Sequence, residues 1–289
     1  MSSRVAPVSC YIRTFNEERK IGDVVAALRN VVDEVVVVDN GSTDDTVAIA
    51  KSQGARVIQQ EWLGRGRQKR FAEEQCRNDY LLDLDADEVV SPKLGAEIRA
   101  LFANGEPSFS VYDLKLVIVP PVGDTWWNVA VVHRRKLYDR RVVRQPDHLA
   151  WDQFEFPEGV PVGRLSEPLM HHAFRDLEHM MQKLNIVTST RAKETRQHRS
   201  RLQVGARVLF AYPIYFLKHY LLRGYFRLGV YGVATAGVLA YGRWLRDAKM
   251  YERLLAERAP PGKVNERTKS PAHRQDSDSQ TPLGGAGGG

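Results

Sequence analysis

Short apolar runs alternate with segments of helical apolar spacing along the first third of the chain. The runs occupy residues 8–12, 35–38, 56–58 and 80–85. After the first run, apolar side chains recur every three or four positions from Ile21 to Val32, which is the spacing of an amphipathic helix. This succession of strands and helices predicts an α/β fold with a mostly parallel sheet that has helices on both faces.

Helix starts and a further strand extend this prediction. The Ser-Thr-Asp-Asp segment at residues 42–45 predicts a capping box that opens one helix, and Ser91 followed by Pro92 predicts the start of another. A helix is also expected at about residues 68–77. Residues 109–119 predict another strand, whereas residues 120–168, which are rich in Trp, Pro and Gly, are expected to be irregular.

Towards the C-terminus the pattern becomes helical and strongly apolar. Helical spacing runs from Asp176 to about Arg199, and apolar runs follow at residues 204–222 and 228–241. Both runs are shorter than the roughly 20 apolar residues that a membrane-spanning helix needs. Because aromatic side chains lie beside Arg and Lys here, we expect helices that lie in the membrane interface. A pair of ordinary core helices is the alternative.

These patterns divide the chain into three expected parts. Residues 1–175 are expected to form the α/β domain that carries the ligand chemistry, and residues 176–257 a basic and apolar helical extension near a membrane. Residues 258–289 are polar and rich in Pro and Gly, so a disordered tail is expected there.

The formal net charge of +7 is concentrated in one region. Residues 191–227 contain nine basic residues, with Glu194 as the only acid. These residues adjoin apolar runs and no nucleic-acid-binding module is recognised, so we expect an anionic membrane surface as partner and no nucleic acid. The two cysteines make no disulfide framework and the N-terminus has no signal-peptide pattern, so we expect a cytoplasmic, peripheral protein on the inner face of the cytoplasmic membrane.

Three aspartates at the end of the fourth apolar run carry the strongest chemical signal. Asp83, Asp85 and Asp87 alternate with apolar residues, so strand periodicity places them on one face. Negative charges so near one another need compensation, and a divalent cation with oxygen ligands would supply it. An EF-hand loop is excluded because Glu88 and Leu94 stand where its Gly and ligand Glu belong. A solvated strand end is the remaining alternative.

Polar residues follow three of the predicted strands. In open α/β sheets, ligands bind beyond the carboxyl ends of the strands, so these side chains are expected to line one crevice. They are Thr14, Asn16 and Glu17 after the first strand, Asp39 after the second, and Asp85 and Asp87 after the fourth. Asp39 is placed to accept hydrogen bonds from a ribose or a base, and an N-terminal helix cap is the alternative. No Gly-rich dinucleotide or Walker-type phosphate motif occurs.

The residues in these positions resemble a known family. Residues 11–18, 38–46 and 84–88 resemble the inverting family 2 glycosyltransferases, whose fold is GT-A. The segment Trp-Leu-Gly-Arg-Gly-Arg-Gln-Lys at 62–69, the Val-Gly-Arg-Leu at 162–165, His171 and the Phe-Arg-Asp-Leu at 174–177 are similar to the bacterial lipopolysaccharide-core β-glycosyltransferase branch. The resemblance covers about residues 6–250.

The resemblance implies roles for the matching residues. Asp39 would contact the nucleotide, most often uridine, and Asn16 and Glu17 would shape the base and ribose pocket. Asp85 and Asp87 match the D-x-D element that holds the nucleotide and a Mg²⁺ or Mn²⁺ on the diphosphate.

The resemblance also implies roles for residues outside these strand ends. Gln68 and Lys69 stand where relatives keep the same pair, with Lys69 on a phosphate or, alternatively, on a solvated helix face. His171 would face the diphosphate or the metal, or else be an ordinary core histidine.

The catalytic base is where this chain departs from its relatives. They commonly show Val-His-Glu before the Gly-Arg-Leu element, where this chain has Trp151, Asp152 and Gln153. Because glutamine is not a useful base, Asp152 or Glu155 is expected to take the proton. Lys136 stands where relatives favour Arg, which removes bidentate geometry toward an anion.

These observations predict a metal-dependent inverting transferase. It would move a sugar, most readily from a UDP-hexose, to a membrane glycolipid or lipopolysaccharide-core acceptor. Transfer to a polyprenyl phosphate is a second hypothesis, for which spanning helices would be expected. A third is a scaffold that binds nucleotide-sugar without catalysis, since the usual Glu is replaced by Gln153.

Overall fold

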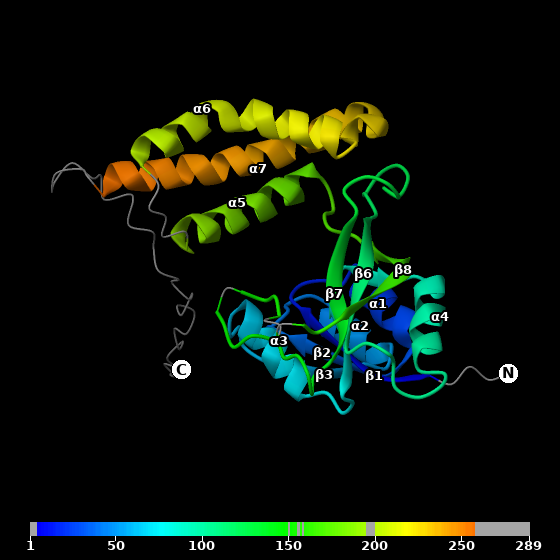
Figure 1. The fold of residues 1–289 in the computed structure, drawn as a ribbon. Coiled ribbons are helices and arrows are strands. Elements are labelled where there is room, and N and C mark those ends of the chain that lie inside the picture. The colour runs from blue at the N-terminus through cyan, green and yellow to red at the C-terminus, as the bar shows by residue number, and fades with distance from the viewer. Residues whose placement is uncertain (1–4, 150, 155–156, 158, 195–199, 258–289) are drawn as a thin grey trace, which may run out of the picture.

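An eight-stranded sheet lies beneath a layer of three long helices in this computed structural model (Figure 1). The structure describes residues 5–149, 151–154, 157, 159–194 and 200–257. The strand order is β3-β2-β1-β4-β7-β6-β8-β5. The strands are β1 (Ala6–Thr14), β2 (Val32–Asp39), β3 (Arg56–Gln59), β4 (Tyr80–Asp85), β5 (Glu88–Val90), β6 (Val111–Ile118), β7 (Val132–Asp139) and β8 (Val162–His171).

Parallel pairs predominate in the sheet, which confirms the expected α/β class. Strands β3, β2, β1 and β4 run parallel, and β6 is parallel to β8. Strand β7 is antiparallel to both β4 and β6, and β5 is antiparallel to β8. The parallel part holds the strands that the apolar runs predicted, and β4 occupies the predicted residues in a central position.

Alternation along the strands builds a core on each face of the sheet. Ala6, Val8, Cys10 and Ile12 of β1 face one core, which includes side chains of α1 (Ile21–Leu28) and α4 (Pro92–Leu101). Tyr11 faces the other core, which includes side chains of α3 (Arg65–Glu74). The remaining helix of this part is α2 (Thr46–Ser52). Helices therefore cover both faces, as the sequence predicted.

Helix starts were predicted with mixed success. At α4, Ser91 is the N-cap, its side chain accepts a hydrogen bond from the Leu94 N–H, and Pro92 is the first helical residue, so this prediction is confirmed. The capping box at residues 42–45 is wrong. Helix α2 begins at Thr46, and its N-cap residue, Asp45, makes no side-chain cap hydrogen bond. The Ser42 hydroxyl instead donates to the Asp39 carboxylate.

The region expected to be irregular contains two strands. Strand β7 and most of β8 fall within residues 120–168. The first half of β7 is largely exposed and includes His133, Arg134 and Arg135, so it lacks the apolar run that marks a buried strand. In β8, polar residues and Pro168 interrupt the apolar pattern. Pairing with strands distant in sequence stabilises both, and sequence periodicity does not record that pairing.

The upper layer contains α5 (Leu177–Glu194), α6 (Arg201–Leu217) and α7 (Gly229–Ala256) (Figure 1). A π-helical turn, η1 (Lys218–Leu222), and a 3₁₀ turn, η2 (Tyr225–Leu228), connect α6 to α7. Arg207 of α6 pairs with the buried Asp247 of α7 at 2.9 Å, and Lys249 of α7 donates to the Asn185 side chain of α5 at 2.7 Å. These contacts fasten α6 and α5 to opposite sides of α7.

An aromatic cluster joins this layer to the sheet. Trp126, Phe174 and Met180 pack with Tyr225 of η2 and Ala236 of α7. Within the described ranges, no helix is both long enough and apolar enough to cross a membrane. The division of the chain after residues 175 and 257 remains a prediction, and the tail at 258–289 lies outside the described residues.

Candidate active site

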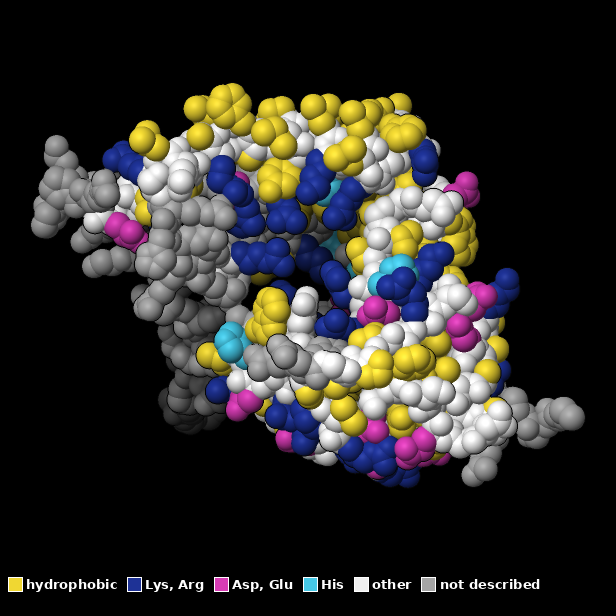
Figure 2. Space-filling view, viewed as in Figure 1, with side chains coloured by type: hydrophobic (Ala, Val, Ile, Leu, Met, Phe, Trp, Pro, Cys, Tyr) yellow, Lys and Arg dark blue, Asp and Glu magenta, His cyan; other side chains and the backbone are white. Residues whose placement is uncertain are grey.

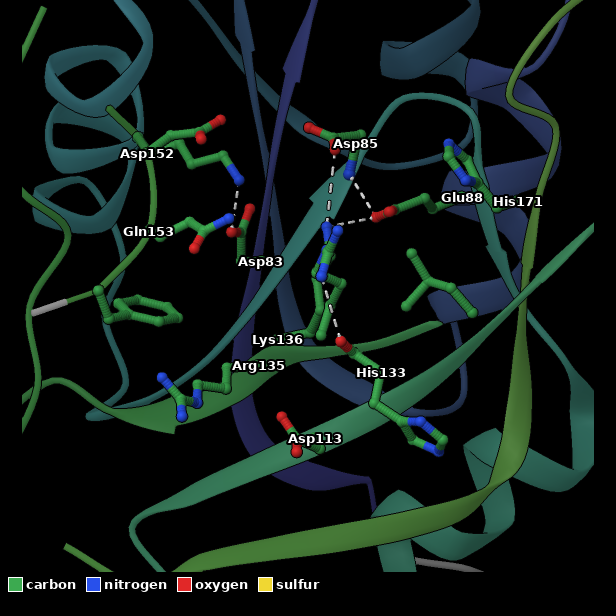
Figure 3. Close-up of a pocket in the computed structure, with 14 residues that line it drawn as sticks. Asp83, Asp85, Glu88, Asp113, His133, Arg135, Lys136, Asp152, Gln153 and His171 are labelled. Atoms are coloured by element: carbon green, nitrogen blue, oxygen red, sulfur yellow. Dashed lines mark hydrogen bonds and ion pairs between the residues drawn. The ribbon is translucent and has the colours of Figure 1, made fainter. Parts of the chain in front are cut away.

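A cavity of about 430 Å³ opens beyond the carboxyl end of β4 (Figure 3). Asp83 and Asp85 reach it from β4, Glu88 from β5, and Lys136 from β7. The connection that contains Asp152 borders it on another side. The cavity therefore lies where the chemistry of an open α/β sheet was expected.

Two ion pairs are buried at this cavity. The Lys69 Nζ lies 2.6 Å from Asp83 Oδ2, and both side chains are almost fully buried. The Lys136 Nζ lies 2.7 Å from Glu88 Oε2. Burial lowers the pKa of Lys136, but Glu88 and then Asp85 outweigh it and raise that pKa, so the ammonium stays charged. Because the ion pair between Lys69 and Asp83 is buried, the alternative that Lys69 lies on a solvated helix face is wrong.

Asp85 stands between two cations. Its carboxylate lies 3.1 Å from Arg13 Nε and 3.6 Å from Lys136 Nζ. Burial raises the pKa of the Asp85 carboxyl, but the surrounding cations, of which Lys136 contributes most, hold it well below its usual range. Arg13 also donates to Asp152 Oδ2 at 3.2 Å. One guanidinium thus brings the candidate base and the first aspartate of the D-x-D element together.

Asp87 lies in the turn after β4, with different partners. Its carboxylate is 3.5 Å from His171 Nε2 and 3.4 Å from Lys183 Nζ of α5. Burial raises the pKa of Asp87, but the hydrogen bond and the charge of His171 outweigh burial, so this pKa lies below its usual value. The same contact raises the pKa of His171 above its usual value despite burial. The expectation that strand alternation places Asp87 beside Asp83 is wrong, because the strand ends at Asp85.

Cations of the chain itself compensate the three aspartates. Each aspartate contacts at least one Lys or Arg side chain, and Asp85 contacts two. Across the described part of the chain, no three His, Cys, Asp or Glu side chains converge on a point that would hold a metal ion. Asp87 and His171 do lie together, so a divalent cation bound here would take most of its remaining ligands from a phosphate-bearing ligand or water.

Asp39 and Gln68 are buried and engaged by the loops around them. The Asp39 carboxylate accepts hydrogen bonds from the Gly41 and Ser42 N–H groups, at 3.0 and 2.9 Å. The Gln68 amide donates to Asn40 Oδ1 at 2.6 Å, and its oxygen accepts from the Leu63 N–H. Both side chains therefore shape the loops that follow β2 and β3, and neither reaches the cavity beside Asp85.

The residues after β1 connect to the same loop. Asn16 has a φ of 52°, and its side-chain oxygen accepts a hydrogen bond from the Thr43 N–H. Burial, followed by the nearby Asp87 charge, raises the pKa of Glu17. Thr14 is buried at the end of β1, and its hydroxyl lacks a hydrogen-bond partner in the described structure. The unpaired hydroxyl marks the end of β1 as a place where a ligand would supply the missing bond.

The structure describes one of the two candidate bases. Asp152 is partly buried and borders the cavity, as does Gln153 beside it (Figure 3). Glu155 lies outside the described residues. Of the two candidates, Asp152 alone can therefore be placed, and it lies across Arg13 from Asp85.

Sequence reasoning missed several residues at this site. Arg13 pairs in register with Asp85 across β1 and β4, a relation that becomes visible only once the two strands are paired. Glu88 had been noted only because it stands where an EF-hand loop needs Gly, and it had no role assigned; its Lys136 partner is 48 positions away. Asp113 and His133 border the cavity from β6 and β7. His133 lies on a strand that the sequence pattern did not predict.

The chain is similar in sequence to known glycosyltransferases. Residues 9–149 match the family model described as "Glycosyl transferase family 2". An "Uncharacterized glycosyltransferase" of Rickettsia felis is 34% identical over 260 residues, which cover 86% of this chain and 90% of the relative. "Lipopolysaccharide core biosynthesis glycosyltransferase LpsC" of Rhizobium meliloti is 28% identical over 252 residues, which cover 86% of this chain and 93% of the relative.

Among solved structures, glucosyl-3-phosphoglycerate synthase from Mycobacterium tuberculosis, in complex with Mg²⁺ and uridine diphosphate, is 26% identical. That similarity covers 39% of this chain and 43% of the other, with a TM-score of 0.32. The family model and the similarity to the Rickettsia relative along most of both chains agree with the resemblance of the motifs. The chain belongs to glycosyltransferase family 2 and is a glycosyltransferase with a GT-A type α/β fold.

Proposed function

We propose that this enzyme transfers a sugar, most readily from a UDP-hexose, to a membrane glycolipid of the lipopolysaccharide-core type, with inversion at the anomeric carbon. The observation that carries the proposal is the position of Asp85. It lies ionised at the end of β4, and Arg13 links it to Asp152 within one cavity. The donor diphosphate would bind at the Asp85 and Asp87 end, and the acceptor hydroxyl would approach Asp152.

A Mg²⁺ or Mn²⁺ ion fits this proposal because the chain supplies a few ligands and the phosphates of the donor would supply the others. Asp87 with His171, and Asp85 nearby, supply the ionised carboxylates and imidazole that such an ion accepts. Magnesium is usually held by one or two carboxylates plus substrate phosphates, which matches this sparse set. When bound, the ion would neutralise negative charge that grows on the leaving diphosphate.

The chain's own residues supply the remaining steps. Lys69, Lys136 and Arg13 place positive charge around the cavity, where it stabilises a leaving diphosphate. Asp152 would take the proton from the acceptor hydroxyl, and Arg13 fixes the position of its carboxylate. A single displacement, with the base on the acceptor side and the diphosphate on the other, inverts the anomeric centre.

Nucleotide calorimetry tests the donor part of this proposal. UDP, GDP and ADP would be titrated with and without Mn²⁺ into the wild type and the Asp87→Ala variant, with Asp124→Ala as an exposed aspartate control. We expect Mn²⁺-dependent binding of UDP that is lost in Asp87→Ala and kept in Asp124→Ala. If no nucleotide binds under either condition, the donor site is misplaced. Equal loss in both variants would show that the effect is not local.

The acceptor part of the proposal rests on the helical layer and on the LpsC relative, whose name refers to lipopolysaccharide-core biosynthesis. Exposed apolar side chains form a row along α6, η1, η2 and the start of α7, which we call the outer apolar face. Figure 2 shows this surface along the edge of the layer away from the sheet. Its members are Leu202, Leu209, Phe210, Ile214, Leu217, Leu221, Leu222, Phe226 and Val230.

Basic side chains lie directly beside the outer apolar face (Figure 2). An apolar surface bordered by Arg and Lys suits an interface with anionic lipid headgroups. Docked in this way, the protein would lie peripherally on the inner face of the cytoplasmic membrane, with the candidate active site on the side of the layer that faces away from the lipid. A lipid-linked acceptor would then reach the site from the membrane.

A further inference from the structure

A second cavity, of about 350 Å³, lies between the helical layer and the sheet. Its lining includes Arg191 of α5, Arg223 after η1, and Arg243 and Arg246 of α7. Leu116 and His171 line both this cavity and the candidate active site, so the two cavities adjoin. Figure 2 shows a hollow bordered by basic side chains below the outer apolar face. We call this second space the arginine cavity.

The arginine cavity has an excess of positive charge. Among the described residues, no acidic side chain lies within 4.0 Å of the guanidinium group of Arg223 or Arg243. Arg246, which also lines the cavity, pairs with Asp247 at 2.9 Å, and Asp247 pairs with Arg207 as well. Burial lowers the pKa of Arg243, and the neighbouring arginines lower it further. Fixed like charges at such a site favour a bound anion.

His219 adds a second and independent observation. This side chain is only 9% exposed, lines the cavity from the π-helical turn η1, and its Nδ1 has no hydrogen-bond partner in the described structure. Burial, followed by the charges of Arg223 and Arg243, lowers the pKa of His219 to about 4, so the ring is neutral near pH 7. A neutral imidazole offers one donor and one acceptor. A buried polar atom without a partner is rare unless a ligand satisfies it, and π-helical turns are frequent at functional sites.

We propose that the arginine cavity binds a phosphate group carried by the acceptor glycolipid and thereby positions the acceptor hydroxyl at the adjoining active site. The inference rests on the proposed function. Guanidinium groups match the geometry of phosphate oxygens and form charge-assisted hydrogen bonds with them. The cavity lies between the outer apolar face and Asp152, which is the path a lipid-anchored acceptor would follow. A phosphorylated acceptor thus fits both the charge and the position.

The test compares two double variants that remove the same charge. Arg223→Gln/Arg243→Gln removes the arginines without acidic partners, and Arg201→Gln/Arg227→Gln removes two exposed arginines of the same layer that do not line the cavity. Binding of glucose 6-phosphate to the full chain would be followed by phosphorus NMR, with unphosphorylated glucose as a competitor. Binding to vesicles of equal parts phosphatidylglycerol and phosphatidylcholine would be measured by sedimentation. Calorimetry with UDP and Mn²⁺ reports on the donor site.

We expect the cavity variant to bind glucose 6-phosphate about tenfold or more weakly, because it loses charge-assisted hydrogen bonds to the phosphate oxygens. The cavity variant should bind UDP and vesicles as the wild type does. The Arg201→Gln/Arg227→Gln control should bind glucose 6-phosphate as the wild type does, and glucose should not compete. If the cavity variant does not fold, the single Arg223→Gln variant carries the same test with a smaller effect.

Three results would overturn the inference. Wild-type protein that does not bind glucose 6-phosphate lacks the site. Equal loss in both double variants means general charge attraction. Loss of vesicle binding with unchanged glucose 6-phosphate binding assigns the cavity to membrane headgroups and not to the acceptor. Failure of UDP to bind the wild type would instead contradict the proposed function and leave the phosphate result standing.

Discussion

The two regions of this molecule that carry charge differ in how that charge is balanced. At the active-site cavity, buried charges come in close pairs, such as Lys69 with Asp83 and Lys136 with Glu88. In the arginine cavity, Arg223 and Arg243 have no acidic partner among the described residues. The first region balances its charges internally, and the second leaves a positive excess.

This difference indicates how each region would meet a ligand. Where pairs are complete, an entering diphosphate competes with carboxylates for the same cations, so binding depends on how the pairs rearrange. Where the excess is positive, an anion lowers the repulsion directly and needs no exchange of partners. The active-site pairs should therefore be sensitive to the loss of either member, while the arginines should tolerate neutralisation without loss of the fold.

The largest expected effect concerns Asp152. Replacing Asp152 with Asn keeps the shape of the side chain but removes the proton acceptor, and general base catalysis typically contributes a factor of about 10²–10⁴. We expect kcat for sugar transfer to fall by that factor while UDP affinity changes little. Steady-state kinetics and UDP calorimetry on the same preparation would separate the two quantities.

Two outcomes would redirect the assignment of the base. A full rate in Asp152→Asn, together with a fall in Glu155→Gln, would give the role to Glu155. No effect from either change would mean that neither carboxylate is the base. Gln153→Ala serves as the control, because its amide borders the same cavity but is no base of useful strength.

The next largest effect concerns the stability of the buried pairs. Lys136→Met leaves Glu88 buried without its partner, and breaking a buried pair from one side typically costs about 3–5 kcal/mol. Denaturant unfolding should show a loss of that size, whereas Lys115→Met on the neighbouring β6 should change stability by less than about 0.5 kcal/mol. A loss below about 1 kcal/mol for Lys136→Met would mean that water replaces the missing ammonium.

The sequence predicted those parts of the fold that depend on neighbouring residues and missed those that depend on distant ones. Strand β4 and the cap at Ser91 depend on neighbouring residues, and both were predicted at the observed positions. Strands β7 and β8 depend on partners far along the chain, and both were missed. The capping box failed because Asp39, three residues earlier, takes the Ser42 hydroxyl. Local signals were reliable where no tertiary contact competed with them.

The site divides in the same way. The carboxylates of β4 could be identified because they follow an apolar run. Their cations could not be assigned, because Lys69 and Asp83 are 14 positions apart and Arg13 and Asp85 are 72 positions apart. The arginine excess was visible as a charge count, but its concentration in one cavity depends on how α5, η1 and α7 pack.

A smaller effect, in the other region, follows from His219. Its pKa is about 4 in the folded protein, below the usual 6.5, so the unfolded chain takes up a proton first as the pH falls. Stability contributed by the neutral ring is complete above pH 6.5 and decreases as the pH falls toward 4, by about 1.4 kcal/mol for each pKa unit of difference at most. The midpoint temperature of thermal unfolding should therefore fall more steeply between pH 7 and pH 4 in the wild type than in His219→Gln. Parallel curves would show that the ring is hydrated in the folded protein.

The smallest expected effect concerns the outer apolar face, where the change should alter membrane binding without altering the fold. Leu209 and Ile214 are 74% and 59% exposed, so Leu209→Ser/Ile214→Ser should change the free energy of unfolding by no more than about 0.5 kcal/mol per site. Burying one such side chain in lipid contributes about 1.5–3 kcal/mol, so affinity for phosphatidylglycerol vesicles should fall by about tenfold or more. The control is Val122→Ser/Val142→Ser, which removes two exposed aliphatic side chains from the sheet domain. Vesicle binding that survives the first change but is abolished by high salt would mean that the basic side chains alone, and not the outer apolar face, hold the protein on the membrane.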